Sequence, residues 1–204
     1  MARSSKSKRA AVRRQRQNGG TSAATRNGAT ADAIALLKAD HREVDEWFGQ
    51  FEKARSDARK VELAHKICSA LKAHTAIEEE IFYPAFLDAT EETDLHHEAE
   101  VEHEGAKNLV ARIEAASPKD EYFDAKVSVL SEMIKHHVKE EEKRGGMFTK
   151  ARQSDMDLES IGKRLQARKD ELTDANGPLG ARLAATLLGR RHSPQHEAAR
   201  RDAR

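Results

Sequence analysis

Two segments of the sequence pair a histidine with a glutamate four residues later, His74 with Glu78 and His137 with Glu141. On a helix this spacing brings both side chains to one face, where they reach the same point. Nitrogen and carboxylate ligands without sulfur suit iron or manganese better than structural zinc, which is usually tetrahedral and often bound by cysteine. Each pair is therefore a candidate half of a metal site.

Each pair has a further histidine upstream, so the pattern is an internal repeat. His41 precedes His74 by 33 residues, and His103 precedes His137 by 34. Two similar helix-pair units side by side predict a four-helix bundle. Six ligands are too many for one metal ion with an open position, so the pattern favours a dinuclear centre bridged by carboxylates. The predicted ligands are His41, His74, Glu78, His103, His137 and Glu141.

Four segments that could position these residues have apolar side chains at spacings of three and four, the pattern of an amphipathic helix. The predicted helices are 32–55, 59–83, 93–116 and 118–144. We expect Pro84 to stop the second helix, Ser117 and Pro118 to begin the fourth, and Gly145-Gly146 to end it. Because the connections are short, neighbouring helices should be antiparallel. The predicted fold class is all-α, an antiparallel up-down-up-down four-helix bundle.

The candidate ligands fall inside the apolar stripes of these helices, as His41 does between Leu37 and Val44. A carboxylate buried without a partner is costly unless it is neutralised or coordinated. Buried metal ions would provide the common partner that the inward histidines and glutamates need. His136 lies one position off the stripe that contains His137, and we predict that it is not a ligand.

The composition restricts the class of protein. Aromatic residues are only 4% of the 204 residues and charged residues are 35%, which disfavours a β-sandwich or barrel and favours helices with charged outer faces. Cys68 is the only cysteine, which excludes an intramolecular disulfide framework and is consistent with a reducing, cytoplasmic location. No apolar run approaches the ~18 residues of a membrane-spanning helix, so we expect no membrane partner.

The sequence divides into three predicted regions. Residues 1–30 contain eight basic residues and no acidic one, which predicts a disordered basic tail able to attract phosphates. Residues 31–150 form the predicted bundle. Residues 151–204 form a C-terminal extension, with a fifth amphipathic helix over 155–173 and a basic tail after it.

Residues from about 32 to 150 resemble the hemerythrin-like (HHE cation-binding) family. The resemblance rests on four motifs: Leu37-Lys-Ala-Asp40-His41, His74-x-x-x-Glu78-Glu79 followed by Phe82-Tyr83-Pro84, Glu102-His103, and His136-His137-x-x-x-Glu141-Glu142. It implies a four-helix bundle that holds a non-haem di-iron centre. By this resemblance one iron is bound by His41 and His74, the other by His103 and His137, and the bridges are Glu78 and Glu141.

One position departs from the oxygen-carrying members of that family. They have a second histidine one turn before the ligand on the third helix, where this chain has Ala99, and Glu100 is a candidate to replace it. With one histidine fewer, an iron keeps a water or an extra open position, which suits chemistry with peroxide or nitric oxide as well as oxygen. Manganese is the alternative metal.

Three functions stay open at this point. The first is a di-iron protein that binds oxygen, peroxide or nitric oxide for sensing, storage or detoxification. The second is a peroxide-decomposing, catalase-like enzyme with the same centre. The third is a metal-switched interaction or DNA-associated protein that acts through its basic tails. We rank the third last, because tails of this composition are commonly solvated.

Overall fold

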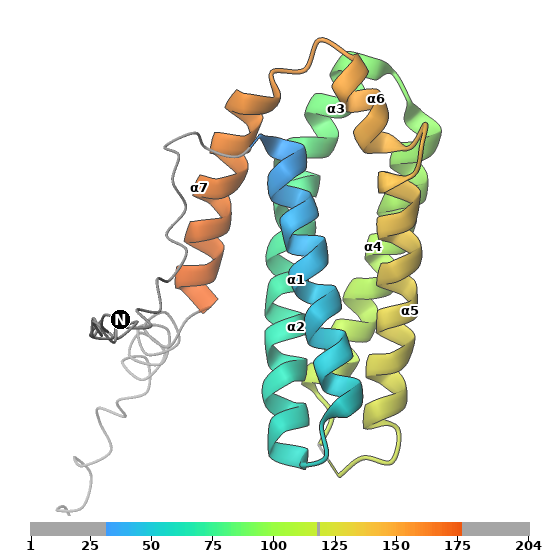
Figure 1. The fold of residues 1–204 in the computed structure, drawn as a ribbon, viewed down its shortest axis with the longest axis vertical. Helices are drawn as coiled ribbons and strands as arrows, with labels where there is room; N and C mark the ends of the chain where they lie inside the picture. The colour runs from blue at the N-terminus through green and yellow to red at the C-terminus, as the bar shows by residue number, and fades with distance from the viewer. Residues whose placement is uncertain (1–31, 118, 177–204) are drawn as a thin grey trace, which may run out of the picture.

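The structure is a computed structural model that describes residues 32–117 and 119–176 (Figure 1). Within these ranges every regular element is a helix, which confirms the all-α prediction. In chain order the elements are α1 (Ala33–Lys53), α2 (Asp57–Ile77), the π-helical turn η1 (Glu78–Phe82), α3 (Tyr83–Thr90), α4 (Thr93–Glu114), α5 (Phe123–Glu142), α6 (Met147–Gln153) and α7 (Leu158–Asn176). The tails predicted to be disordered lie outside the described residues.

Helices α1, α2, α4 and α5 form the predicted up-down-up-down four-helix bundle (Figure 1). Helix α1 packs on α2 and α5, and α4 packs on α2 and α5, so the four helices enclose one interior. The short helices α3 and α6 lie together at one end of the bundle. Helix α7 is the predicted fifth helix and lies along the outside of α1 and α2. No helix within the described ranges is long and apolar enough to cross a membrane.

The helix boundary predicted at Pro84 was wrong, because the chain stays helical through that residue. Helix α2 passes into the wider turn η1, and α3 then begins at Tyr83 with Pro84 in its first turn. Proline is tolerated there because it lies in the first turn of α3, directly after the change from π-helical to α-helical hydrogen bonding. Because the π-helical turn changes the hydrogen-bonding pattern just before Pro84, the helix continues even though Pro84 has no N–H to donate.

The predicted start of the fourth helix was also wrong. Helix α5 begins at Phe123, not at residue 118. Ser117 instead organises the preceding turn, since its Oγ accepts a hydrogen bond of 3.3 Å from the N–H of Lys119. A side chain that bonds to the backbone two residues ahead stabilises a turn in place of a helix.

A pair of glycines makes the reversal between α5 and α6. Gly145 has a φ of 81°, which favours glycine, and a Cβ at Gly146 would collide with the carbonyl oxygen of Glu140. The chain therefore turns tightly after α5 ends at Glu142. The turn sends α6 back over the end of the bundle, where Phe148 is buried.

The interior consists of two apolar clusters, one in the body of the bundle and one under α3, α6 and α7. Along each bundle helix the candidate ligands fall between a residue of one cluster and a residue of the other. The flanking pairs are Leu37 and Val44, Leu71 and Phe82, Ala99 and Ala106, and Ile134 and Met147, of which Phe82 lies in η1 and Met147 in α6. The sequence thus places one polar layer between two apolar clusters.

Candidate metal centre

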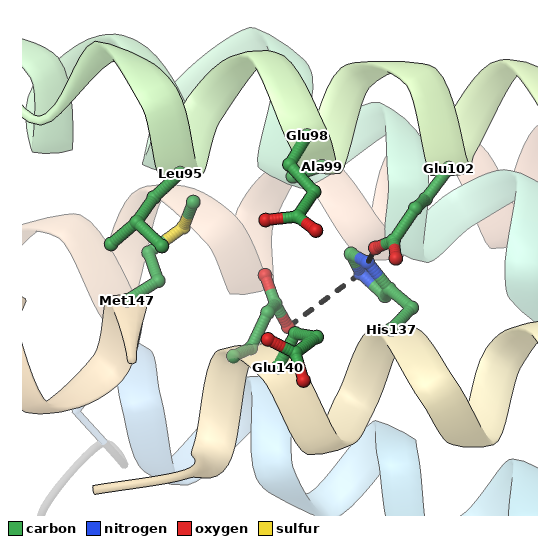
Figure 2. Close-up of a pocket in the computed structure, with 8 residues that line it drawn as sticks. Leu95, Glu98, Ala99, Glu102, His137, Glu140 and Met147 are labelled. Carbon is green, nitrogen blue, oxygen red and sulfur yellow. Dashed lines mark hydrogen bonds and ion pairs between the residues drawn. The ribbon is translucent and has the colours of Figure 1, made fainter. Parts of the chain in front are cut away.

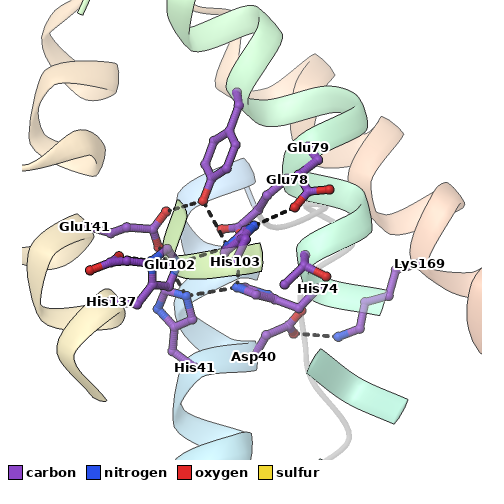
Figure 3. Close-up of polar contacts among 12 residues, drawn as sticks. Asp40, His41, His74, Glu78, Glu79, Glu102, His103, His137, Glu141 and Lys169 are labelled. Atoms are coloured by element: carbon purple, nitrogen blue, oxygen red, sulfur yellow. Dashed lines mark hydrogen bonds and ion pairs between the residues drawn. The ribbon is translucent and has the colours of Figure 1, made fainter. Parts of the chain in front are cut away.

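The six residues predicted as ligands lie together in the polar layer (Figure 3). They come from α1, α2, η1, α4 and α5, and none is more than 6% exposed. The members are His41, His74, Glu78, His103, His137 and Glu141. Charged and titratable side chains are rarely buried to this degree without a partner.

The four histidines form two pairs with their Nε2 atoms facing each other. The Nε2 atoms of His41 and His74 are 3.1 Å apart, and those of His103 and His137 are 3.2 Å apart. Two ring nitrogens at this distance need either a proton or a cation between them. Each pair, taken with Glu78, forms a group whose ligand atoms lie within 4.8 Å of one another.

The two glutamates connect the histidine pairs. Glu78 Oε2 lies 3.2 Å from His74 Nε2 and 3.4 Å from His103 Nε2. Glu141 Oε2 lies 3.4 Å from His41 Nε2 and 3.7 Å from His137 Nε2. Each carboxylate therefore reaches one histidine of each pair, as a bridge between two metal ions would.

The carboxylate oxygens lack the hydrogen bonds that burial would require. Within the described part of the chain, both oxygens of Glu78 and Oε2 of Glu141 are buried without a hydrogen-bond partner. An unsatisfied buried carboxylate is strongly unfavourable unless a cation neutralises it. The donor set and these oxygens fit metal binding, since His41, His74 and Glu78 form one group that could hold an ion, and Glu78, His103 and His137 form another.

The electrostatics of the layer also favour added positive charge. Burial and repulsion by Glu78 raise the pKa of Glu141 to about 8. Burial opposes ionisation of Glu78 as well, but the positive charge of His74 and the approach of His103 Nε2 to 3.4 Å hold the pKa of Glu78 well below its usual value. Burial disfavours the charged form of His74, yet Glu78 and Asp40 raise its pKa to about 10. Glu78 and Glu141 therefore repel each other when both are ionised, and a nearby cation would relieve this repulsion.

A second layer of carboxylates lies behind the histidines. Each histidine turns Nε2 to the centre and Nδ1 to an acidic side chain on another element, which fixes the ring orientation (Figure 3). The distances from Nδ1 to the carboxylate are 2.9 Å for His41–Glu142, 3.4 Å for His74–Asp40, 2.9 Å for His103–Glu79 and 2.7 Å for His137–Glu102.

Helical periodicity alone does not identify the whole of this outer layer, although the sequence contains a signal for it. Asp40, Glu79, Glu102 and Glu142 each adjoin a predicted ligand in the sequence. Consecutive residues on a helix point about 100° apart. When a ligand faces the centre of the bundle, the acidic residue beside it therefore faces the adjacent helix. The pattern to look for is therefore an acidic residue directly beside one ligand of each ligand-bearing helix, as found at His41, Glu78, His103 and Glu141.

Two aromatic residues close the centre on the side of α3 and α6. The Tyr83 hydroxyl donates a hydrogen bond of 3.2 Å to Glu141 Oε1 and lies 3.2 Å from His103 Nε2. Burial, together with the charges of Glu78 and Glu141, raises the pKa of Tyr83 well above its usual value, so its hydroxyl keeps its proton. Phe148 stacks on the ring of His41, with centroids 5.7 Å apart and planes 8° apart.

Two other polar residues considered from the sequence lie outside the cluster. The side chain of His136 is 61% exposed and its Nε2 lies 3.3 Å from Glu102. Glu100 is exposed and lies 3.6 Å from His96, so it does not take the place of the histidine that Ala99 replaces.

A small pocket approaches the centre between α4 and α5, where the Glu141 and His137 side chains meet it (Figure 2). Ala99 lines this pocket, and its short side chain leaves room beside the two candidate ligands. The lining residues are Leu95, Glu98, Ala99, Glu102, His137, Glu140, Glu141 and Met147.

Comparisons with known proteins agree with this geometry. The profile of the hemerythrin HHE cation-binding domain matches residues 32–145. Over 107 residues, 52% of this chain, the sequence is 29% identical to a protein from Nostoc sp. named DNA nickase, and it spans only 30% of that protein's length.

A crystal structure of a hemerythrin HHE cation-binding domain-containing protein from Mycobacterium kansasii is similar with a TM-score of 0.59. The similarity covers 76% of this chain and 99% of that one, and at 19% identity it shows the fold alone. The profile match covers more than half of the chain and includes all six predicted ligands. The chain therefore belongs to the hemerythrin HHE cation-binding domain family, whose members are helical metal-binding proteins.

Proposed function

We propose that this protein is a non-haem di-iron protein that binds a small ligand, namely oxygen, peroxide or nitric oxide, for sensing, storage or detoxification. The observation that carries the proposal is the pair of facing histidine couples joined by two buried glutamates with unsatisfied oxygens. A donor set of nitrogen and oxygen without sulfur favours iron, with manganese as the alternative.

The number of protein ligands supports binding of a further small molecule. Each compact group offers two histidines and Glu78, and an iron held by such a set would keep open positions for a further ligand. The small pocket beside Ala99 borders Glu141 and His137, so it is the side of the centre where we expect such a ligand to bind (Figure 2). When bound, the metals would supply redox and Lewis-acid chemistry to a ligand in the open positions.

The chain's own residues would orient and protect that ligand. Tyr83 keeps its proton and presents its hydroxyl next to Glu141 and His103, so it can hold or donate a proton within the centre. Phe148 and the apolar cluster under α3 and α6 exclude water from the other side. We place this function in the cytoplasm, since a single cysteine fits a reducing compartment.

The first experiment is elemental mass spectrometry and an absorption spectrum on protein purified without a histidine tag. We expect about two irons per chain and a near-ultraviolet band from an oxygen-bridged pair. A folded protein that takes up neither iron nor manganese would refute the proposal. Adding excess peroxide to the iron-loaded protein distinguishes the catalase-like enzyme from a protein that only binds the ligand. Sustained oxygen release would indicate turnover, and stoichiometric bleaching would indicate binding.

A second candidate function is DNA association. It is favoured by the name of the Nostoc relative and by the eight basic residues among the first 30, which face no acidic residue. Salt-dependent retention on DNA that disappears when residues 1–30 are deleted would support this function. Absence of retention at low salt would eliminate it.

A further inference from the structure

Every carboxylate of the outer layer is itself next to a cationic or titratable side chain. Lys38 pairs with Glu142 at 2.8 Å, Lys107 with Glu79 at 2.7 Å, and His136 with Glu102 at 3.3 Å. The fourth carboxylate, Asp40, pairs with Lys169 at 2.5 Å. The first three partners lie within residues 32–145, which match the family profile, whereas Lys169 belongs to α7 outside that match.

Asp40 depends on its partner more than the other three carboxylates do. The side chain of Asp40 is 9% exposed, compared with 28% for Glu142, 32% for Glu79 and 20% for Glu102. Water can solvate a partly exposed carboxylate, so an ion pair there contributes little. A buried carboxylate that loses its partner is left without compensation. Lys169 is therefore the partner whose removal should matter most.

Lys169 covers Asp40 on the side that faces a large cavity. A cavity of about 820 Å³ lies between α1, α2 and the C-terminal part of α7, and both Asp40 and Lys169 line it. On the other side of Asp40, its Oδ2 lies 3.4 Å from His74 Nδ1 (Figure 3). The Lys169–Asp40 pair thus separates His74 from the open cavity.

The residue next to Lys169 makes a second contact between α7 and the rest of the protein. Arg168 forms a bidentate pair with Glu80 of η1, at 2.7 Å from Nε and 3.1 Å from Nη2. Glu80 lies two residues after Glu78 in the same turn. Ile161 and Leu165 anchor α7 in the apolar cluster. Adjacent residues of α7 therefore hold α1 and η1, the elements that contribute His41 and Glu78.

We propose that α7 supports one half of the metal centre, and that Lys169 is a positioning residue for His74 through Asp40. Lys169 fixes the Asp40 carboxylate, which in turn holds the His74 ring with Nε2 toward the metal. The half with His41 and His74 then depends on Lys169, which contacts Asp40. His103 and His137 are instead oriented by Glu79 and Glu102, whose partners are Lys107 and His136. This inference rests on the proposed metal centre and assigns a role to a helix outside the matched domain.

The test is the release of iron from the full-length protein to an iron(II)-specific chelator, followed by absorbance after reduction. Outer carboxylate contacts of metal-bound histidines are worth about 10–100-fold in metal affinity. We expect Lys169→Met to release one of the two irons about 10–100-fold faster, with the other unchanged. Lys169→Arg should restore the slow rate, because it keeps the charge.

The matched control is Lys107→Met, which removes the corresponding partner of the more exposed Glu79 and should leave both rates within about twofold of wild type. In an Asp40→Asn background, Lys169→Met should add little, because no buried charge is left to neutralise. Wild-type rates for both irons in Lys169→Met would overturn the proposal, as would equal acceleration of both. A wild-type protein that binds no metal would instead refute the proposed function, and this inference with it.

Discussion

Replacing Glu78 tests the assignment of the centre most sharply, because Glu78 is the residue shared by both compact groups of candidate ligands. Its Oε2 lies 3.2 Å from the Nε2 of His74 and 3.4 Å from that of His103. Glu78→Gln keeps the volume but removes the charge, so both metal positions should lose a ligand. His137→Ala removes a ligand from one group only. We therefore expect about two metals in the wild type, about one in His137→Ala and close to none in Glu78→Gln.

The thermal stability should follow the same order. Each occupied site stabilises the folded state by about 4 kcal/mol when free metal exceeds the dissociation constant about a thousandfold. For a chain of this size, about 2–4 °C per kcal/mol gives a metal-dependent rise in Tm of about 8–16 °C per site. The rise is measured by calorimetry as the difference between the loaded and metal-free forms of each variant, so effects on the apoprotein cancel.

The control for this series is His136→Ala, which changes an exposed neighbour of His137 outside the cluster. Its metal content and its rise in Tm should equal those of the wild type. Equal metal content in all four proteins would refute the ligand assignment. A Glu78→Gln variant that keeps one metal, as His137→Ala should, would refute the bridging role of Glu78.

Three further predictions concern the scaffold. Leu130→Ala, at a fully buried position, should lower the free energy of unfolding in urea by about 2–5 kcal/mol, whereas Val129→Ala, at a position 49% exposed, should change it by less than about 0.5 kcal/mol. Burial, with Glu114 nearby, raises the pKa of Cys68 to about 12, so a thiol reagent at pH 8 should react with Cys68 only after denaturation; rapid reaction of the native protein would contradict its buried position. Gly146→Ala should cost about 1–3 kcal/mol, measured by thermal unfolding, because its Cβ collides with the backbone of α5; an unchanged Tm would show that the turn can relax.

Much of the fold follows directly from the pattern of the sequence. Apolar residues at spacings of three and four identify α1, α2, α4, α5 and α7. The inward face of each helix follows from the same count, which is why the six predicted ligands meet in space. Their role as metal ligands remains a prediction that the experiments above address.

Local turn chemistry and contacts between helices were harder to predict. A proline such as Pro84 breaks a helix when it lies in the interior and is tolerated when it lies in the first turn. The π-helical turn before Pro84 places it in a first turn, and the sequence pattern did not predict that turn. Asp40 and Lys169 are 129 residues apart, and no periodicity relates α7 to α1. Such contacts depend on the packing of α7, which the spacing within a single helix cannot show.

The polar layer between two apolar clusters also controls how the helices can slide along one another. A shift of α4 by one turn, about 5.4 Å, would move His103 out of the layer and put Ala99 or Ala106 opposite Glu78. His103 would then face an apolar cluster and Glu78 would lose the approach of His103, so burial of polar groups without partners disfavours the shifted alignment. The apolar residues alone would permit several such alignments. The six proposed ligands therefore favour, by their burial in one layer, the same alignment of the bundle that brings them together.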